Sequence, residues 1–468
     1  MEQELIRLKI ISTEMNTPLT AMFITDVMKS FGFPKKRAVL LCFTVESFLE
    51  SRLRQLSSEN PFVEVIVSQG IRKISISIGD KGVPYVLTDA QRKMLSRGLA
   101  DSYRFEQLGC EGQRLVLGFR RETDSDIPLP TPEEETLLDD NISVVPMGTE
   151  DWEINEAIRC FYSAYGYEYL HQSLYNIDHF KTMLKDGSCI AALAKNEHGQ
   201  VLGISSLMRD GDFPGLYEIS ATVTKPFARN HHVAQKINNY LLEQMEKIDA
   251  ECLYTCPVAF HTATQKIFNS CGMTPFGFIF HGFPAKSVGA FRDGDRRPDY
   301  AISAVVKDKT KLRRFCLPEQ LHGFIAQRME MEGLRYTFLP EDGVLPAESE
   351  IIMDIDAYTA ITTFIVNACA ADFDEKFTEM FRSRAVQQTE MVLLFLNAGR
   401  KGAEEACRSL KELGFLFTGL IPGSTNGEYV IFQHMMGMPI QRERIELIDN
   451  YADLVAQILA LNAPPEGC

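Results

Sequence analysis

The chain has 468 residues, of which 45% are hydrophobic and 24% are charged. This composition is typical of globular domains and excludes collagen-like or largely disordered chains, and the length predicts about three domains. The 48 basic and 63 acidic side chains give a net charge of −15, and an acidic surface disfavours non-specific binding of nucleic acid or anionic membrane.

A break at residues 121–141 sets the domain organisation. This segment contains three prolines, eight acidic side chains and one basic side chain, and proline together with like-charge repulsion favours an extended linker. A weaker break lies at residues 336–350. We therefore predict a domain at 1–121, an acidic linker at 122–141, a central domain at 142–335 and a C-terminal domain at 350–468.

The first domain is predicted to contain a helix followed by a β-hairpin. Residues 37–56 have apolar side chains at near-helical spacing, which predicts a largely buried helix. Residues 62–70 and 71–82 alternate apolar and polar side chains with a period of two, which is typical of paired antiparallel strands. The second strand ends in a Gly/Pro turn at residues 80–84.

Two glycine-containing segments of this domain carry a family resemblance. The motif Asp-x-Gly-x-Pro at 80–84 and the segment LGCEGQRL at 108–115 resemble the histidine-kinase-like ATPase fold, most closely its anti-sigma-factor serine-kinase branch. The resemblance implies an α/β sandwich that binds ATP, in which Asp80 accepts the adenine amino proton. The glycines that it assigns to the loops around the nucleotide are Gly82, Gly109 and Gly112.

The same resemblance leaves the metal site of that family incomplete. The family places an acid on the preceding helix and, four residues later, an Asn that holds Mg²⁺. Glu46 matches the acid, but Glu50 stands where the Asn is expected. We therefore assign no metal ligand, and a tight turn without any ligand remains the alternative for residues 80–84.

The central domain mixes strands and helices in an α/β layer pattern. Alternating and periodic apolar side chains predict its elements. The predicted strands are 142–147, a hairpin over 188–209, 215–225, 253–260, 276–285 and 300–307, and the predicted helices are 233–250 and 262–272.

The strand at 215–225 runs through residues 226–234 directly into the helix at 233–250. This junction resembles the GNAT superfamily of acetyltransferases, whose signature is Arg/Gln-x-x-Gly-x-Gly/Ala; the signature matches at its Arg and Ala positions and has a His at its central Gly. The resemblance implies acetyl-CoA or another acyl-CoA as cofactor, with the pyrophosphate on N–H groups at the helix N-terminus. The residues that it assigns to the cofactor are Ala221, Val223, Arg229, Asn230, His231, His232, Val233 and Ala234.

The catalytic candidates come from the same resemblance. Glu218 lies where several GNAT enzymes place a general base, and His261 is a candidate polar group on the substrate side. The Tyr that usually protonates the leaving thiolate is replaced by Phe268, which has no proton to donate. Tyr254 or Cys256, on the strand before that helix, is the remaining candidate for the acid.

The C-terminal domain is predicted to repeat part of the central one. Residues 391–435 predict strand, helix, strand and strand, and Leu-Gly-Phe at 413–415 matches Cys-Gly-Met at 271–273. The segment resembles the second half of a GNAT fold without the pyrophosphate loop, which implies a degenerate module kept for packing or partner recognition. A last amphipathic helix is predicted at 442–461.

Together these features predict a multidomain α/β protein with an ATPase-like sandwich, a central GNAT fold and a GNAT-like C-terminal half. The resemblances favour a cytoplasmic N-acyltransferase that acts on a small-molecule or protein amine and carries a regulatory ATP-binding module. The alternative is a non-catalytic sensor of nucleotide, CoA or a sigma-factor-type protein partner; a homodimer is compatible with both. No apolar run approaches the ~20 residues of a membrane-spanning helix, and eleven scattered cysteines predict reduced thiols.

Overall fold

The structure is a computed structural model that describes residues 3–11, 16–33, 35–54, 56, 62–69, 73–83, 88–96, 100–108, 112–120, 141–166, 169–284, 297–340, 345–356 and 359–463. The chain forms two compact units, Met1–Pro130 and Thr131–Cys468. The division between them falls within the predicted linker. No helix in the described ranges is both long enough and apolar enough to cross a bilayer.

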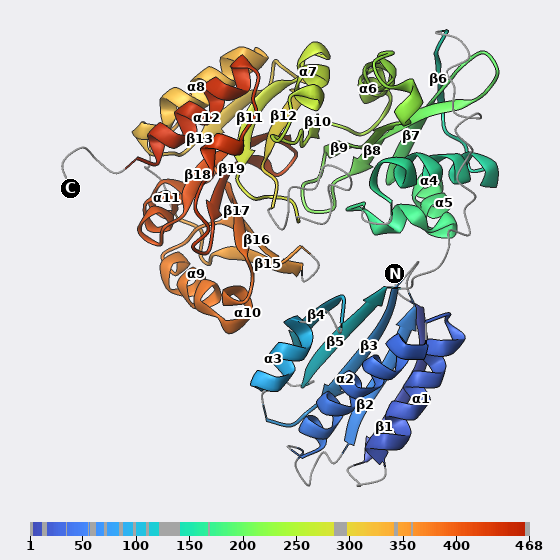
Figure 1. The fold of residues 1–468 in the computed structure, drawn as a ribbon. Helices are drawn as coiled ribbons and strands as arrows, with labels where there is room; N and C mark the ends of the chain where they lie inside the picture. The colour runs from blue at the N-terminus through green and yellow to red at the C-terminus, as the bar shows by residue number, and fades with distance from the viewer. Residues whose placement is uncertain are drawn as a thin grey trace. The chain divides into compact units, whose positions relative to one another are not determined.

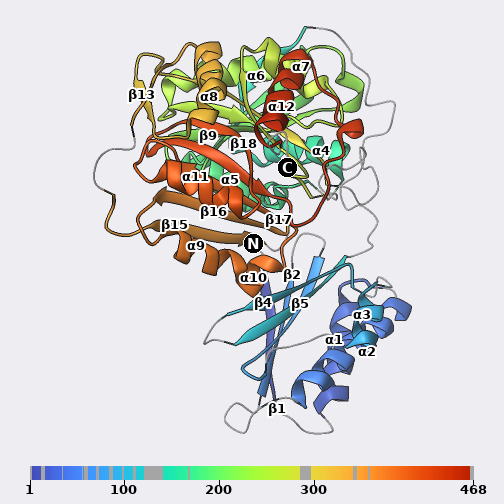
Figure 2. The ribbon, with the colours of Figure 1, turned by 90° about the vertical axis from the view of Figure 1, so that its left-hand side faces the viewer.

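The first unit is a two-layer α/β sandwich. Its five-stranded sheet is antiparallel throughout and has the order β1-β2-β3-β5-β4. The helices cover one face of this sheet (Figures 1 and 2). The elements are β1 (Gln3–Ile11), α1 (Asn16–Ser30), α2 (Lys35–Leu53), β2 (Phe62–Gln69), β3 (Lys73–Asp80), α3 (Asp89–Ser96), β4 (Ser102–Gln107) and β5 (Gln113–Arg120).

The predicted hairpin is present as β2 and β3, which pair with Glu64 opposite Gly79. The alternation of the sequence becomes an alternation of faces, because successive strand side chains point to opposite sides of a sheet. The side chains that pack against the helices are Val63, Val65, Val67, Ile74, Ile76 and Ile78.

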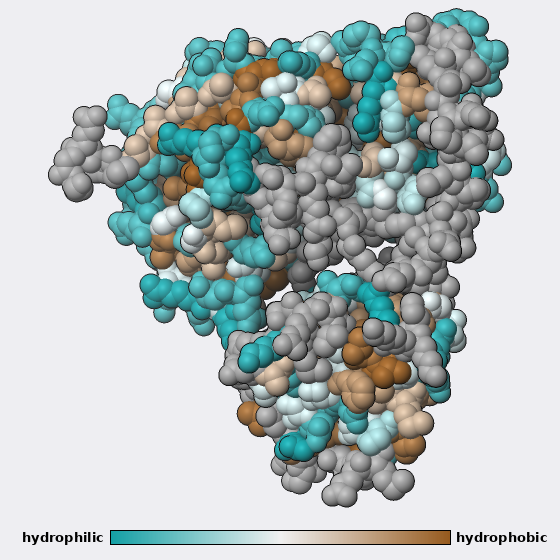
Figure 3. All heavy atoms as spheres, in the orientation of Figure 1, coloured by the Kyte–Doolittle hydropathy of each residue, from teal (hydrophilic) through white to brown (hydrophobic). Residues whose placement is uncertain are grey.

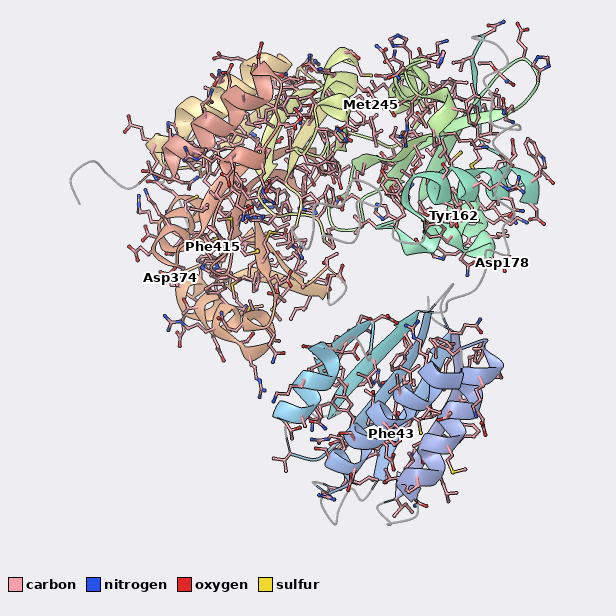
Figure 4. All side chains as sticks on the ribbon, in the orientation of Figure 1. Phe43, Tyr162, Asp178, Met245, Asp374 and Phe415 are labelled. Carbon is pink, nitrogen blue, oxygen red and sulfur yellow. The ribbon has the colours of Figure 1, made fainter. Side chains whose placement is uncertain are left out.

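Helix α2 is less buried than its sequence predicts. A single layer of helices covers the sheet, so the outer faces of α1 and α2 meet solvent within this unit. Phe43 is 59% exposed and is labelled on α2 in Figure 4, and Figure 3 shows hydrophobic side chains over these helices. The exposed large apolar side chains of α1 and α2 are Leu19, Met22, Phe23, Val39, Leu40 and Phe43.

The second unit is built on one twelve-stranded sheet. Its order is β15-β16-β17-β19-β18-β11-β12-β10-β9-β8-β7-β6. The strands are β6 (Ser143–Pro146), β7 (Cys189–Lys195), β8 (Val201–Arg209), β9 (Leu216–Thr224), β10 (Cys252–Thr255), β11 (Thr274–Ile279), β12 (Tyr300–Val306), β15 (Glu350–Asp356), β16 (Ile361–Ala368), β17 (Met391–Asn397), β18 (Leu416–Ser424) and β19 (Gly427–His434), and β13 (Leu312–Phe315) pairs separately with β14 (Arg335–Phe338).

Helices flank both faces of this sheet (Figure 1). They are α4 (Asp151–Tyr165), α5 (Ile177–Asp186), α6 (Val233–Gln244), α7 (Ala263–Ser270), α8 (Glu319–Glu332), α9 (Phe373–Arg382), α10 (Arg384–Gln387), α11 (Ala403–Glu412) and α12 (Asp449–Leu461). The predicted α/β class is therefore confirmed for both units.

The large sheet contains one strand arrangement twice. In the first half β9 runs parallel to β10, followed by β12 and β11; in the second half β16 runs parallel to β17, followed by β19 and β18. The halves join where β11 meets β18, with Gly277 opposite Gly419. A Cβ on Gly419 would lie 2.3 Å from the Gly277 Cα, so the strands can approach this closely only because residue 419 has no side chain. The expected central and C-terminal domains thus share one sheet and one compact unit.

The last helix is shorter than its sequence predicts. Residues 442–461 are predicted as one helix, but α12 begins at Asp449. The chain before it is anchored by a side chain of α7: Gln265 Nε2 donates to the Glu446 carbonyl at 2.8 Å, and the Ile448 N–H donates to Gln265 Oε1 at 3.1 Å. These contacts replace the hydrogen bonds that a longer helix would have made.

Candidate functional site

The central feature of the second unit is an opening between β9 and β10. The two strands pair in parallel over three positions, the last being Tyr254 opposite Glu218. β10 ends at Thr255, whereas β9 continues to Thr224. A bulge at Ala221, whose φ is +55°, bends β9 at this point. Among the described residues, no strand therefore pairs with β9 on that side beyond Glu218.

A loop and a helix N-terminus lie at the far end of β9. The chain passes through a short turn at Pro226–Ala228 and enters α6 at Val233. Asn230 and His232 both have positive φ, 68° and 58°, a conformation that glycine adopts most readily. The His232 side chain does not cap the helix, so the N–H groups of its first turn are not satisfied by that residue.

The eight predicted cofactor residues are placed together by this geometry. Ala221 and Val223 lie on β9 beside the opening, and Arg229, Asn230 and His232 are on the exposed side of the loop. The residue set is compatible with an acyl-CoA, which has an extended arm that can lie along a strand edge and a diphosphate that a helix N-terminus can bind. The remaining three are His231, Val233 and Ala234.

Gly203 also shapes this region, and sequence analysis misses it. A Cβ on Gly203 would lie 2.6 Å from the Val223 carbonyl oxygen and 2.9 Å from the Val233 side chain. The glycine therefore lets β8 approach the end of β9 and the start of α6. A lone glycine within an apolar strand was the only signal in the sequence.

Glu218 lies at the point where β9 and β10 separate. Its side chain is half-buried, and burial raises its pKa to about 7. The negative charge of Asp210 acts in the same direction, and a hydrogen bond with Ser220 acts in the opposite one. A carboxyl group that titrates near pH 7 exchanges protons readily at physiological pH.

Tyr254 is the neighbour of Glu218 across the two strands. Its hydroxyl donates to Asp210 Oδ2 at 2.7 Å, and burial raises its pKa well above the usual value. Cys256 follows on the same chain segment, and burial also raises the pKa of its thiol well above the usual value. The structure thus brings Glu218 and Tyr254 together, with the Tyr254 proton directed to Asp210.

Two further polar residues face this place from the chain between α4 and α5. His171 Nε2 is 3.2 Å from Ser220 Oγ, and burial lowers the pKa of the imidazole to about 4, so that the ring is neutral at pH 7. Tyr169 forms hydrogen bonds with Ser220 and with the backbone of Ala221, and burial raises its pKa. Sequence analysis misses both, because this segment carries no motif.

His261 lies outside β9, β10 and the loop before α6, which carry the other candidates. It precedes α7, its ring contacts that of Phe260 at a centroid distance of 4.8 Å, and burial lowers its pKa while the charge of Glu446 raises it. Phe268, at the position expected for the acid, is 4% exposed and belongs to the apolar core. The substrate role of His261 stays a prediction.

The second half of the sheet has a pocket beside the end of β16, and the residues that line it include Cys369, Phe373, Gly402 and Ala406. β16 and β17 pair over six positions, up to Val366 opposite Leu396, and α9 begins soon after, at Phe373. These two strands stay paired almost to their ends, whereas β9 and β10 pair over three positions only. The predicted absence of a pyrophosphate loop from this half stays a prediction.

In the first unit, the Asp80 carboxylate, which is predicted to bind adenine, is already paired with protein groups. Asp80 forms a bidentate ion pair with Arg52, with Nε–Oδ2 and Nη2–Oδ1 distances of 2.6 and 2.5 Å. It also accepts hydrogen bonds from the Gly82 N–H at 2.7 Å and from Gln113 Nε2 at 3.2 Å. Both carboxylate oxygens therefore already have donors. Sequence analysis misses Arg52, whose only signal is its helical spacing from the apolar residues of 37–56.

Of the other residues predicted to bind the nucleotide, the structure describes Gly82, Gly112 and Glu46. Gly112 has a φ of +102°, and a Cβ there would lie 2.2 Å from the Asp80 carbonyl oxygen, so this position requires glycine. Glu46 is half-buried on α2. Gly109 lies outside the described residues. The nucleotide role of these residues stays a prediction.

Comparison with known proteins adds structural neighbours for about a third of the chain. No family model matches the sequence, and no curated protein matches it. Among solved structures, an N-acetyltransferase from Staphylococcus aureus is similar at 17% identity, with 36% of this chain and 98% of that chain covered and a TM-score of 0.29. Spermidine/spermine N-acetyltransferase from Vibrio cholerae is similar at 11% identity (36% and 95% covered, TM-score 0.29), as is a dodecameric spermidine N-acetyltransferase from the same organism (11%, 36% and 96% covered, TM-score 0.30). Scores of this size do not establish a shared activity.

Proposed function

We propose that the second unit transfers an acyl group from acyl-CoA to an amine. The observation that carries this proposal is the position of Glu218, a carboxyl with a pKa of about 7 at the divergence of β9 and β10. The opening, the base and the helix N-terminus are contiguous along one stretch of chain, from residue 216 to residue 244.

The donor side of the site is the strand edge and the loop that follows it. The edge of β9 beyond Glu218, where β10 no longer pairs with it, can take an extended amide-containing arm, as an added strand does. N–H groups between Asn230 and Ala234 and the positive end of α6 stabilise phosphate. A bound acyl-CoA would supply a thioester carbonyl, and the exposed guanidinium of Arg229 lies where it can meet phosphate charge.

The acceptor side requires removal of a proton. An alkylamine is an ammonium ion at neutral pH and must lose a proton before its nitrogen can attack a carbonyl carbon. Glu218 is the acceptor for that proton, directly or through water, because its pKa lies near the working pH. Tyr254 remains the candidate acid for the leaving thiolate, and its hydrogen bond to Asp210 would have to break or exchange when it donates.

The negative charge of Asp210, which acts on Glu218, favours a positively charged acceptor. Asp210 acts electrostatically on Glu218, and Asp210 and Asp354 both act on Asp212, whose pKa is raised by burial and by these two charges. A negative field of this kind attracts ammonium groups. The proposed substrate class is therefore an amine that is cationic in solution.

The test is acetyl transfer from acetyl-CoA to a panel of amines, followed by thiol release. Glu218→Gln should lower kcat by roughly two to four orders of magnitude, the usual contribution of a general base, and leave the dissociation constant of acetyl-CoA within about twofold. Asp178→Asn, an exposed carboxylate on α5, is the matched control and should be neutral. Binding of acetyl-CoA without transfer to any amine would contradict the enzyme and favour the sensor alternative.

The first unit is proposed as a regulatory module. Its exposed apolar stripe on α1 and α2 supports contact with another protein surface, because patches of several hundred Å² commonly mark interaction sites. ATP binding and a sigma-factor-type partner stay predictions from the sequence resemblance.

A further inference from the structure

The turn between β8 and β9 links the site to the second half of the sheet. Asp210 organises this turn: its Oδ1 accepts the N–H groups of Asp212 at 2.9 Å and Phe213 at 3.1 Å, and its Oδ2 accepts the Tyr254 hydroxyl at 2.7 Å. One carboxylate therefore fixes both the turn and a side chain next to Glu218.

The tip of this turn is held by residues of the C-terminal half. Phe213 is 5% exposed, and its ring centroid lies 5.0 Å from that of Phe395 and 4.9 Å from that of Tyr429. The Pro214 carbonyl accepts the Thr425 N–H at 2.9 Å. Aromatic contacts at these distances contribute about 0.5–1.5 kcal/mol each beyond their area burial. The turn is thus anchored by strands β17 and β19 and by the β18–β19 connection.

We propose that the C-terminal half is a positioning element of the acyl-transfer site: by holding Phe213 it fixes Asp210, and Asp210 in turn fixes the hydrogen-bonded surroundings of Glu218. This inference rests on the proposed function. It also gives a role to the half of the sheet for which the sequence predicts no pyrophosphate loop. Phe213 and Asp210 are positioning residues, since they act through Glu218 and Tyr254.

The titratable groups around Glu218 determine how its pKa would change if the contacts of Phe213 were lost. Tyr169, Tyr254, Cys256 and Tyr300 all interact electrostatically with Glu218, and burial raises each of their pKa values, so they are neutral near pH 7. Within the part of the chain that the structure describes, Asp210 is the negative charge that acts on Glu218. Displacing Asp210 should therefore lower the pKa of Glu218.

The experiment follows the titration of Glu218 in the full chain. The protein is labelled with ¹³C on the glutamate side-chain carboxyl, and the Glu218 signal is assigned by its loss in Glu218→Gln. Phe213→Ala should lower the midpoint from about 7 by about half a unit to one unit, Asp210→Asn should do the same, and the double variant should show no further fall, because both act on one interaction. Phe213→Leu, which keeps an apolar anchor, should restore most of the midpoint.

Phe373→Ala is the matched control. It removes a buried ring of α9 that stacks on Phe377, at a similar expected cost in stability, and should leave the Glu218 midpoint unchanged. If Phe213→Ala does not fold, Phe395→Leu tests the same anchor from the other half.

Two outcomes separate this inference from the proposed function. The positioning role would be overturned if the Glu218 midpoint moves in Asp210→Asn but stays within about 0.2 units of wild type in Phe213→Ala and Phe395→Leu. That conclusion would hold even if amine acetylation is intact. A midpoint that moves as expected in a protein that acetylates no amine would overturn the proposed function alone.

Discussion

Removing the Asp80 charge should destabilise the first unit, because it leaves a buried guanidinium without its counter-ion. The side chains of Arg52 and Asp80 are 2% and 1% exposed, and Arg52 Nη2 also donates to the Val83 carbonyl at 2.9 Å. Breaking a buried pair by changing one partner costs about 3–5 kcal/mol. In Asp80→Asn, the Arg52 charge keeps the Val83 carbonyl and a neutral amide oxygen as acceptors, which places the loss at the lower end of that range.

This magnitude is a large part of the stability of a small domain, which is typically about 5–15 kcal/mol. We would monitor urea unfolding of the full chain by hydrogen exchange of the β3 and β5 amides. The free energy of opening of the first unit should be about 3 kcal/mol lower in Asp80→Asn than in wild type. Arg52→Leu combined with Asp80→Leu should recover most of the loss, because neither charge is then buried.

A loss below about 1 kcal/mol in Asp80→Asn would refute this reasoning. The same comparison bears on the ATP prediction: a nucleotide would have to compete with Arg52 for the Asp80 carboxylate. Calorimetry with ATP and ADP on the wild-type chain tests whether a nucleotide can do so, and undetectable binding would contradict the ATP prediction.

Three further results are expected. The pKa of Glu218 is about 7 in the folded chain and 4.5 without the fold, so folding favours its protonated form; the stability from this group is present below pH 4.5 and is lost as pH rises through 7. In urea unfolding, Glu218→Gln should therefore be more stable than wild type by up to about 3 kcal/mol at pH 8 and equal to it near pH 4. His232→Gly should relieve a positive φ and raise the stability of the second unit by up to about 1 kcal/mol. In calorimetry, the same variant should bind acetyl-CoA more tightly if the imidazole crowds the loop. Weaker binding, most evident below about pH 6.5, would show instead that the imidazole charge contributes to binding. Gly419→Ala should destabilise the join between β11 and β18 by more than 1 kcal/mol (about the usual effect of a core substitution), since its Cβ would meet the Gly277 backbone; unchanged thermal unfolding would contradict the tight approach.

Local patterns in the sequence determined most of the secondary structure near the site. The strands expected at 188–209 and 215–225 are present, and the helix expected at 233–250 begins at Val233 but ends at Gln244, because period-two and helical patterns report which side chains must be buried. In the first unit, the hairpin expected at 62–82 is also present. The Glu218 position and the loop at 229–234 follow from the same stretch, and their closeness in the chain is why they could be recognised together.

Only the tertiary structure decided what those residues meet. The Asp80–Arg52 pair, the contacts of Ser220 with His171, and the anchoring of Phe213 by Tyr429 join residues that are 28, 49 and 216 positions apart. The pKa of Glu218 depends on burial and on Asp210 across a strand pair, which no local pattern encodes. The join of Gly277 to Gly419 was equally hidden, because a sheet edge is completed by whichever distant strand satisfies its backbone hydrogen bonds.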